Sequence, residues 1–188
     1  MDKRELILSE AEKLFAEKGY YGLGLTELLT RCKIPKGSFY YYFPGGKIQL
    51  IQEVLNFSYR RMRGRIDEWM AKETSAVAAF SGMADRLTAG VVKKRHLASM
   101  LLSMIAIESV YLDVQVNETC RRIYIDWQEF YADHLMRFGF SAQESRVKAQ
   151  AVFALIHGSL ISSWIKQDPA DLQMAKDALE SLFGEKTA

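Results

Sequence analysis

The sequence predicts an all-α protein of about nine helices, in which a three-helix N-terminal module precedes a larger C-terminal helical domain. Only 3 of the 188 residues are proline, and the strong helix formers Ala, Leu, Met, Glu and Lys are abundant. Apolar residues recur at spacings of three and four, and few segments alternate as half-buried strands do. Hydrophobic residues make up 49% of the chain, which indicates a globular protein. We expect domains over residues 1–46 and 47–188.

Capping and stop signals set the expected helix ends. Asp2 with Glu5, and Ser141 with Glu144, have the spacing of a capping box, in which two side chains satisfy free N–H groups of the first turn. Gly19 is expected to stop the first helix, because glycine readily adopts the conformation that ends helices. The expected helices span residues 3–18, 26–32, 34–43, 47–72, 74–94, 96–111, 118–138, 141–167 and 170–183, followed by a frayed tail over 184–188.

The short helix expected between Pro35 and Pro44 divides its residues between two faces. Phe39 and Phe43 are four positions apart, so they share a face that is expected to turn toward a core. The remaining surface carries an ammonium group, hydroxyls and a glycine, from Lys36, Gly37, Ser38, Tyr40, Tyr41 and Tyr42. These groups suit the phosphates and base edges of double-stranded DNA. The alternative is a solvated helix whose tyrosines pack on a neighbouring element.

Basic residues are concentrated in the first third of the chain. Residues 1–63 contain 11 Lys and Arg against 7 Asp and Glu, whereas residues 64–188 contain 14 against 16. Residues 28–52 include Arg31, Lys33, Lys36 and Lys47 and no acidic residue. A nucleic-acid contact is therefore expected in the first module, since phosphate binding depends on clustered positive charge.

The segment from Lys18 to Leu50, KGYYGLGLTELLTRCKIPKGSFYYYFPGGKIQL, resembles the N-terminal helix-turn-helix of the TetR/AcrR family of transcriptional regulators. The most specific part is KGSFYYYF followed shortly by a lysine. The segments GLGLTELL and IPKGSFY are similar to the branch that includes electrophile-sensing repressors. The extra residue in PGGK resembles the LmrA-type multidrug-resistance repressors.

The resemblance implies roles for individual residues of this helix-turn-helix module. It implies that Lys36 and Ser38 touch base edges or the DNA backbone. It also implies that Tyr40 and Tyr42 bind phosphates and that Lys47 lies at the start of the next helix, where we expect it to contact the DNA.

Two positions depart from the family pattern. Gly24 stands where many members have Ser or Thr, which caps the second helix and binds a phosphate, so Thr26 is expected to supply a hydroxyl instead. Lys33 occupies a turn position that is often glycine. This predicts a non-glycine residue at positive φ, or simply an added cation.

On this resemblance the protein is expected to be a cytoplasmic, sequence-specific DNA-binding transcriptional regulator, a repressor released by a small hydrophobic or aromatic ligand. One short helix contacts few base pairs, so a homodimer and a near-palindromic operator are expected. Small residues on the eighth helix and apolar residues on the ninth predict an interface through the last two helices. These residues are Ala151, Ala154, Gly158 and Ser162, with Leu172, Ala175, Leu179 and Leu182.

The larger domain is expected to hold an apolar effector pocket, because methionines among aromatic residues form an adaptable lining. The expected lining is Met100, Met104, Ile107, Tyr111, Trp127, Tyr131, Phe153, His157 and Trp164. Ordinary core packing explains much of the same set. His157 is the polar member, and its imidazole needs a partner from the protein or from a ligand.

The sequence contains no pattern that indicates catalysis, a metal site or a cofactor. GGK lacks the spacing of a phosphate-binding P-loop, and HGSLI is not a nucleophile elbow, so no enzyme activity is expected. Cys32 and Cys120 are 88 positions apart without CxxC spacing, although cysteine sensing of electrophiles remains an alternative. The most apolar run, residues 97–107, is too short to span a membrane. An all-helical enzyme or ligand carrier, and a protein-interaction adaptor, are the other classes considered; specific, salt-dependent DNA binding separates them.

Overall fold

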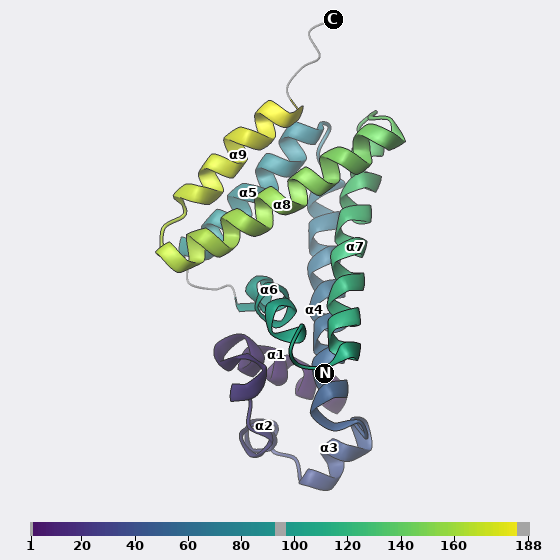
Figure 1. Ribbon diagram of the computed structural model, residues 1–188, viewed down its shortest axis with the longest axis vertical. Helices are drawn as coiled ribbons and strands as arrows, with labels where there is room; N and C mark the ends of the chain where they lie inside the picture. Colours follow the sequence, from purple (N-terminus) through teal and green to yellow (C-terminus); the bar gives the residue numbers. More distant parts are fainter. Residues whose placement is uncertain (1, 93–96, 184–188) are drawn as a thin grey trace, which may run out of the picture. The chain divides into compact units, whose positions relative to one another are not determined.

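The computed structural model describes residues 2–92 and 97–183, with side chains over 2–92 and 101–183. These ranges form nine α-helices and no strand, which confirms the predicted all-α class (Figure 1). None of the described helices combines the length and apolar composition needed to cross a bilayer. The helices are α1 (Lys3–Gly22), α2 (Leu25–Cys32), α3 (Lys36–Tyr42), α4 (Gly46–Met70), α5 (Ala76–Val92), α6 (Leu97–Ser109), α7 (Val114–Arg137), α8 (Ala142–Lys166) and α9 (Ala170–Phe183).

The described chain forms two compact units. The first unit contains α1, α2, α3 and α6 with the first parts of α4 and α7, over residues 2–62 and 97–123. The second contains α5, α8 and α9 with the remaining parts of α4 and α7, over residues 63–92 and 124–183. α6 thus belongs to the same compact unit as the N-terminal helices, although it lies far beyond the predicted domain boundary after residue 46. That boundary concerns independently folding domains and stays a prediction.

The first unit is built on the inward faces of its short helices. Leu28 of α2 and Phe39 of α3 are almost completely buried, and each such side chain contributes about 1.5–3 kcal/mol. A polar contact also joins α1 to α4. The buried carboxylate of Glu12 accepts hydrogen bonds from Ser58 and, at 2.6 Å, from Arg61. These partners compensate the burial of a charge, which is costly when it is unpaired.

In the second unit, α5, α8 and α9 pack side by side (Figure 1). Phe80 of α5 stacks on Phe183 of α9 with ring centroids 5.1 Å apart, and it meets Tyr131 of α7 edge-on at 5.6 Å. His134 of α7 is buried, and its Nε2 lies 2.9 Å from an oxygen of Asp67 on α4. Burial lowers the pKa of His134, and Asp67 opposes that shift.

The two expected capping boxes have different outcomes. At α8 the Ser141 side chain accepts a hydrogen bond from the Glu144 N–H, and the Glu144 carboxylate accepts one from the Ser141 N–H, which confirms the prediction. At α1, Asp2 occupies the N-cap position but its side chain forms no capping hydrogen bond. The predicted box between Asp2 and Glu5 is therefore wrong, although the spacing is the same.

Other helix ends differ from expectation by a few residues. Gly19 has φ 69° and ψ −177°, so it breaks α1 as predicted, but helical turns continue to Gly22. α7 begins at Val114, before the expected residue 118, because Asp113 Oδ1 accepts a hydrogen bond from the Gln115 N–H at 2.7 Å. The expected ends at residues 94 and 96, and the frayed tail over 184–188, lie outside the described residues.

Candidate nucleic-acid interface

The turn between α2 and α3 contains a lysine in the left-handed conformation. Lys33 has φ 54° and ψ 45°, and its N–H donates to the carbonyl of Thr30 at 3.2 Å. The predicted positive φ at this position is therefore confirmed. Ile34 then donates to the carbonyl of Leu29 at 3.1 Å, a pattern that closes a helix C-terminus and reverses the chain ahead of α3.

α3 separates its side chains between a buried and an exposed arc. Phe39 is 1% exposed and Phe43, just after the helix, is 0% exposed, which confirms the inward face. Tyr41 is 81% exposed. At about 100° per residue, the exposed positions fall in one continuous arc that begins beside Phe43 and ends at Tyr41, opposite the two phenylalanines. These positions are Lys36, Gly37, Tyr40 and Tyr41.

The other two predicted contact residues of this helix lie between the Tyr41 end of the arc and the buried face. Ser38 and Tyr42 are half-buried. The Tyr42 ring meets the Tyr41 ring edge-on, with centroids 5.1 Å apart. The alternative of tyrosines packed on a neighbour therefore fits Tyr42 better than Tyr41, whose ring projects into solvent.

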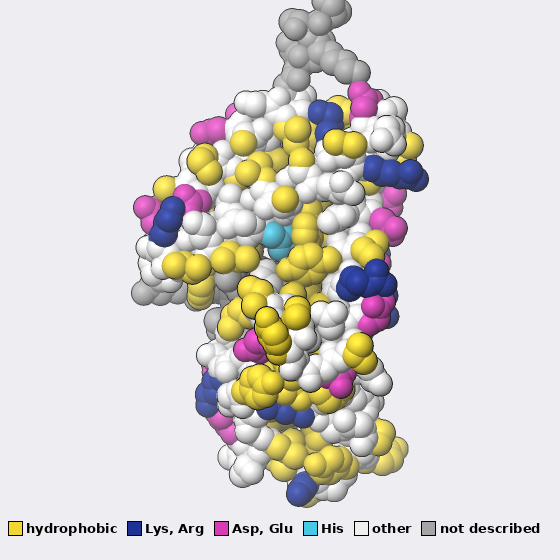
Figure 2. Space-filling view, viewed as in Figure 1, with side chains coloured by type: hydrophobic (Ala, Val, Ile, Leu, Met, Phe, Trp, Pro, Cys, Tyr) yellow, Lys and Arg dark blue, Asp and Glu magenta, His cyan; other side chains and the backbone are white. Residues whose placement is uncertain are grey.

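Acidic neighbours neutralise some cations of the module and leave others exposed. Glu27 binds Lys18 at 2.7 Å and Arg31 at 3.0 Å, and these hydrogen bonds hold the pKa of the Glu27 carboxyl below its usual value. Lys33 and Lys36 are exposed and form no ion pair with any described residue. At the lower end of Figure 2, over α3, a dark blue Lys or Arg side chain lies beside yellow side chains; yellow is the colour that the figure also gives to tyrosine. This surface can attract phosphate.

Thr26 lies exposed in the first turn of α2, next to the exposed face of the module. Gly24 is the N-cap of α2 and provides no side-chain cap. The carbonyl of Thr26 accepts a hydrogen bond from the Thr30 hydroxyl at 2.9 Å, and the exposure of the residue is compatible with the predicted DNA contact.

Lys47 is half-buried in the first turn of α4 and is engaged with the protein. Its Nζ donates to the carbonyl of Leu23 at 2.7 Å and lies 4.4 Å from the centroid of the Tyr20 ring. An ammonium group has three protons, so the predicted DNA contact stays a prediction. The two residues that position Lys47 carried no signal in the sequence.

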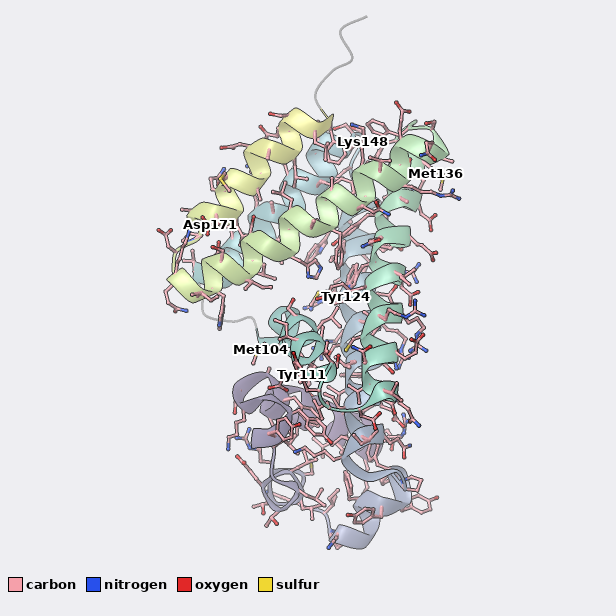
Figure 3. The ribbon with its side chains drawn as sticks, in the orientation of Figure 1. Met104, Tyr111, Tyr124, Met136, Lys148 and Asp171 are labelled. Carbon is pink, nitrogen blue, oxygen red and sulfur yellow. The ribbon has the colours of Figure 1, made fainter. Side chains whose placement is uncertain are left out.

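The predicted effector residues of the first unit do not form an enclosed lining. Met100 lies outside the described side chains, and Met104 is half-buried (Figure 3). Ile107 is 68% exposed and Tyr111, labelled in Figure 3 and located in the turn after α6, is 87% exposed. The last two side chains therefore point into solvent, where the sequence led us to expect pocket residues.

In the second unit most of the predicted lining residues are part of the core. Trp127, Tyr131 and Phe153 are between 2% and 5% exposed, and Trp164 is half-buried. The rings of Trp127 and Tyr131 lie 5.7 Å apart, so these two predicted neighbours do contact each other. Their burial agrees with the core-packing alternative as well as with a pocket wall.

His157 belongs to an aromatic cluster with one member that the sequence analysis missed. Its ring lies 4.0 Å from the Phe153 centroid and 5.8 Å from that of Tyr124, which Figure 3 labels on α7. Its Nδ1 is buried without a hydrogen-bond partner among the described residues. Burial lowers the pKa of His157 to about 4, so the ring is neutral at pH 7. The spacing of three between Tyr124 and Trp127 was the signal that would have identified Tyr124.

A separate groove of about 430 Å³ lies between α7 and α8. Its lining mixes polar and apolar side chains and includes Glu129, Asp133 and Arg146, with Ile125 and Met136 as its large apolar members. None of the predicted effector residues lines it. The groove therefore differs in place and in chemistry from the apolar pocket that the sequence predicted.

Both cysteines are buried, which disfavours the thiolate that electrophile sensing needs. Burial raises the pKa of the Cys32 thiol above its usual value and that of Cys120 to about 11. A protonated, buried thiol is a poor nucleophile, so the cysteine alternative loses support.

The residues predicted for dimerisation divide into an exposed and a buried set. Ala151, Ala154 and Gly158 are exposed on α8, and Ser162 is half-buried with its hydroxyl donating to a carboxylate oxygen of Asp171. By contrast, three residues of α9 are 0% exposed within the chain itself, and these are Leu172, Ala175 and Leu179. Among these predicted residues, the exposed set therefore belongs to α8, while Leu182 of α9 is half-buried.

Two family models match the chain in consecutive regions. Residues 7–54 match the bacterial regulatory proteins of the tetR family, and residues 76–178 match the C-terminal domain of LmrA/YxaF-like transcriptional regulators. The first match covers α2, α3 and the turn between them, and the second covers most of the second unit.

Whole-length relatives agree with these matches. The HTH-type transcriptional regulator LmrA of Bacillus subtilis is 31% identical over 182 residues, covering 97% of each chain. YxaF of the same organism, an HTH-type transcriptional regulator, is 24% identical and covers 98% of this chain and 97% of its own. The crystal structure of reduced NemR from E. coli superposes with a TM-score of 0.89 at 22% identity, covering all of both chains, which shows the fold.

Proposed function

We propose, from the premise that this chain belongs to the TetR family of bacterial transcriptional regulators, that it represses transcription as a homodimer on a near-palindromic operator and that a small effector releases it. The chain is a DNA-binding regulator of the LmrA/YxaF type. Members of the family typically dimerise and bind small-molecule effectors. The operator form, the dimer surface and the effector chemistry are our proposals.

The observation that carries the proposal is the exposed arc of α3. Lys36 supplies positive charge, and Tyr40 and Tyr41 supply hydroxyl groups. Gly37 leaves open space, since a Cβ there would meet nothing within 4 Å, and this permits close approach of the backbone to DNA. Such an arc offers hydrogen-bond donors to phosphates and base edges while the phenylalanines anchor the helix behind it.

The length of α3 supports a paired arrangement on DNA. The helix has 7 residues and reaches only a few base pairs, so two copies supply the specificity that one lacks. Two copies of α3 in successive major grooves require half-site centres about 34 Å apart, or a multiple of that distance. The operator is then an approximate palindrome.

Selection of bound sequences from a random DNA pool tests this proposal. We expect a near-palindromic consensus whose affinity exceeds that of scrambled DNA and falls steeply with salt. Lys36→Ala should relax preference at particular bases, whereas Tyr40→Phe should weaken binding to all sequences alike. Equal binding of selected and random DNA would instead favour a carrier or an interaction adaptor.

We place the dimer contact on the exposed strip of α8. Ala151, Ala154 and Gly158 are small, so a second helix can approach this strip closely. Met174 of α9, the helix that packs against α8, is 59% exposed and adds apolar surface. The buried leucines of α9 hold that helix against its own chain and are not part of this surface.

Gly158→Trp tests the dimer surface, because a Cβ at Gly158 meets no described atom within 4 Å. The tryptophan variant should therefore fold normally, but its side chain should prevent the close approach of a second α8. We expect the dissociation constant of the dimer to rise by at least about tenfold. Gly64→Trp is the matched control, since Gly64 is also an open helical glycine, on α4. Unchanged dimer mass for Gly158→Trp in sedimentation equilibrium would remove α8 from the interface.

For the effector we propose a neutral aromatic molecule with a hydrogen-bond donor, held at the cluster of Tyr124, Phe153 and His157. An aromatic surface favours a flat ligand, and the unpartnered Nδ1 of the neutral His157 ring accepts a hydrogen bond in the tautomer that carries its proton on Nε2. The ligand donates to a nitrogen that otherwise lacks a partner.

A matched pair of probes tests this chemistry. 1-Naphthol should bind about fivefold or more tightly than naphthalene, because one net hydrogen bond contributes about 1 kcal/mol. His157→Phe should remove the preference while keeping an aromatic ring at this position. Binding is measured by calorimetry, and operator release by fluorescence anisotropy of labelled DNA. Equal binding of both probes would contradict the role of His157.

A further inference from the structure

The residues between the break in α1 and the start of α2 are held at one end by a side chain from α6. Because Gly19 is not helical, the N–H of Tyr20 can bond outside α1. Glu108, in the last turn of α6, accepts this hydrogen bond through Oε2 at 2.9 Å. α1 and α6 pack against each other within the first unit (Figure 1).

Gly19 suits this contact in two independent ways. Its φ of 69° is one that residues with a side chain rarely adopt. In addition, a Cβ at this position would lie 2.6 Å from Glu108 Oε1, well inside contact distance. The carboxylate of Glu108 therefore occupies space that only a glycine leaves open.

The other end of the same segment is held by a side chain from α4. Lys47 Nζ donates to the carbonyl of Leu23 at 2.7 Å, directly before the N-cap of α2. The ammonium also lies over the buried ring of Tyr20, 4.4 Å from its centroid. Burial lowers the pKa of Lys47, and the negative charge of Glu108 opposes that shift. The two opposite charges therefore attract each other, and both contact Tyr20.

We propose that Glu108 and Lys47 are positioning residues for the DNA-reading helices: together they fix the segment from Gly19 to Leu23, and with it the place where α2 and α3 leave α1. The inference rests on the proposed DNA-binding function. It gives α6 a direct hold on the chain that leads into α2. Withdrawal of Glu108 by a shift of α6 frees the Tyr20 amide and releases one end of this segment.

The test combines operator titration at several salt concentrations with amide hydrogen exchange on the full chain. Glu108→Ala removes the acceptor and should raise the operator Kd about tenfold with an unchanged salt slope, while Glu108→Gln keeps an acceptor and should stay within about threefold. The exchange of the Tyr20 amide should accelerate in Glu108→Ala. Peptides of the second unit should exchange as in wild type.

Glu12→Gln is the control, because it weakens a buried contact between α1 and α4 without touching this segment. It should lower the melting temperature but leave the operator Kd within about twofold below that temperature. Equal losses of affinity in Glu12→Gln and Glu108→Ala would show that Glu108 contributes only to the stability of the fold, and would overturn the proposal. So would wild-type affinity in Glu108→Ala.

Lys47→Gln separates positioning from a phosphate contact. A higher Kd with an unchanged salt slope supports positioning, whereas a slope lower by about 0.9 per lost contact makes Lys47 a phosphate ligand and overturns its positioning role. Failure of wild type to prefer its selected operator would refute the proposed function alone. Hydrogen exchange at Tyr20 needs no DNA, so it still decides whether Glu108 holds the segment.

Discussion

α3 and α8 each bury one face and expose the other, but their exposed faces differ in chemistry. α3 presents Lys36 and Tyr41 to solvent, whereas the exposed strip of α8 presents Ala151, Ala154 and Gly158. A face with charge and hydroxyl groups suits a hydrated polyanion, while a strip of small residues suits a second helix. The amphipathic period is the same in both helices. Residue type, and not the pattern of burial, therefore distinguishes a DNA-binding face from a helix-packing face.

The largest expected effect separates the two faces of α3 itself. Phe39→Ala removes a ring that is 1% exposed and should lower the free energy of unfolding by about 3–5 kcal/mol. Tyr41→Ala removes a ring that is 81% exposed and should change it by less than about 0.5 kcal/mol. Urea denaturation of both variants measures this difference.

The order of the two variants should be reversed for operator affinity, when both are measured under conditions in which they are folded. Tyr41→Ala should lose affinity, because its exposed ring and hydroxyl lie on the proposed DNA-binding arc. A Tyr41→Ala variant with full affinity and reduced stability would identify α3 as an ordinary packed helix and would remove the contrast with α8.

The buried side of α8 provides the second test, through pH. His157 has a pKa of about 4 in the folded chain, below its ordinary value of 6.5. Between these values the unfolded chain binds a proton at this position and the folded chain does not, so stability falls as pH falls. The loss attributable to His157 should reach up to about 3 kcal/mol near pH 4.

His157→Phe isolates this contribution. Wild type also contains His134, whose pKa is lowered by burial, so the informative quantity is the difference between the two pH profiles. The variant should lose less stability than wild type from pH 7 to pH 4.5, as measured by urea denaturation at each pH. Parallel profiles would show that His157 is accessible to protons in the folded state.

Local features of the sequence predicted the helices and the orientation of α3. Phe39 and Phe43 fix its buried side within a few residues, and Pro35 and the glycines after Pro44 bound it. The exposed strip of α8 followed from the same reasoning. The apolar stripe of α9 was also found, but periodicity does not specify what an apolar face packs against. Leu179 packs within its own chain and is 0% exposed, where we expected a partner subunit.

Contacts between distant residues carried no local signal. Gly19 was expected only to stop a helix, and nothing near it indicates a carboxylate 89 positions later. α6 is too uniformly apolar for periodicity to assign its faces, which explains why the exposed Ile107 was expected in a pocket. Tertiary packing decides both cases, and the residue pattern of a single sequence does not reveal it.

The smallest expected effects come from removing one serine hydroxyl at α8 and one in α3. Ser141 caps α8 by accepting from the Glu144 N–H, and Ser141→Ala should cost about 1 kcal/mol of stability. Ser38 lies half-buried in the first turn of α3, whose N-cap is Pro35 without a side-chain cap bond. Its hydroxyl forms no hydrogen bond with a described residue, so Ser38→Ala should cost less than about 0.5 kcal/mol.

Operator binding should again reverse the order of these two variants. Ser38→Ala should weaken binding by about 0.5–1.5 kcal/mol, because a hydroxyl on the reading helix gains its partner only when DNA is present. Ser141→Ala should leave the operator Kd unchanged at temperatures where α8 is folded. Thermal denaturation and operator titration on the same samples measure both quantities. If Ser38→Ala instead matches Ser141→Ala in stability and keeps full affinity, its hydroxyl faces the protein and the DNA-binding arc ends at Lys36, Gly37, Tyr40 and Tyr41.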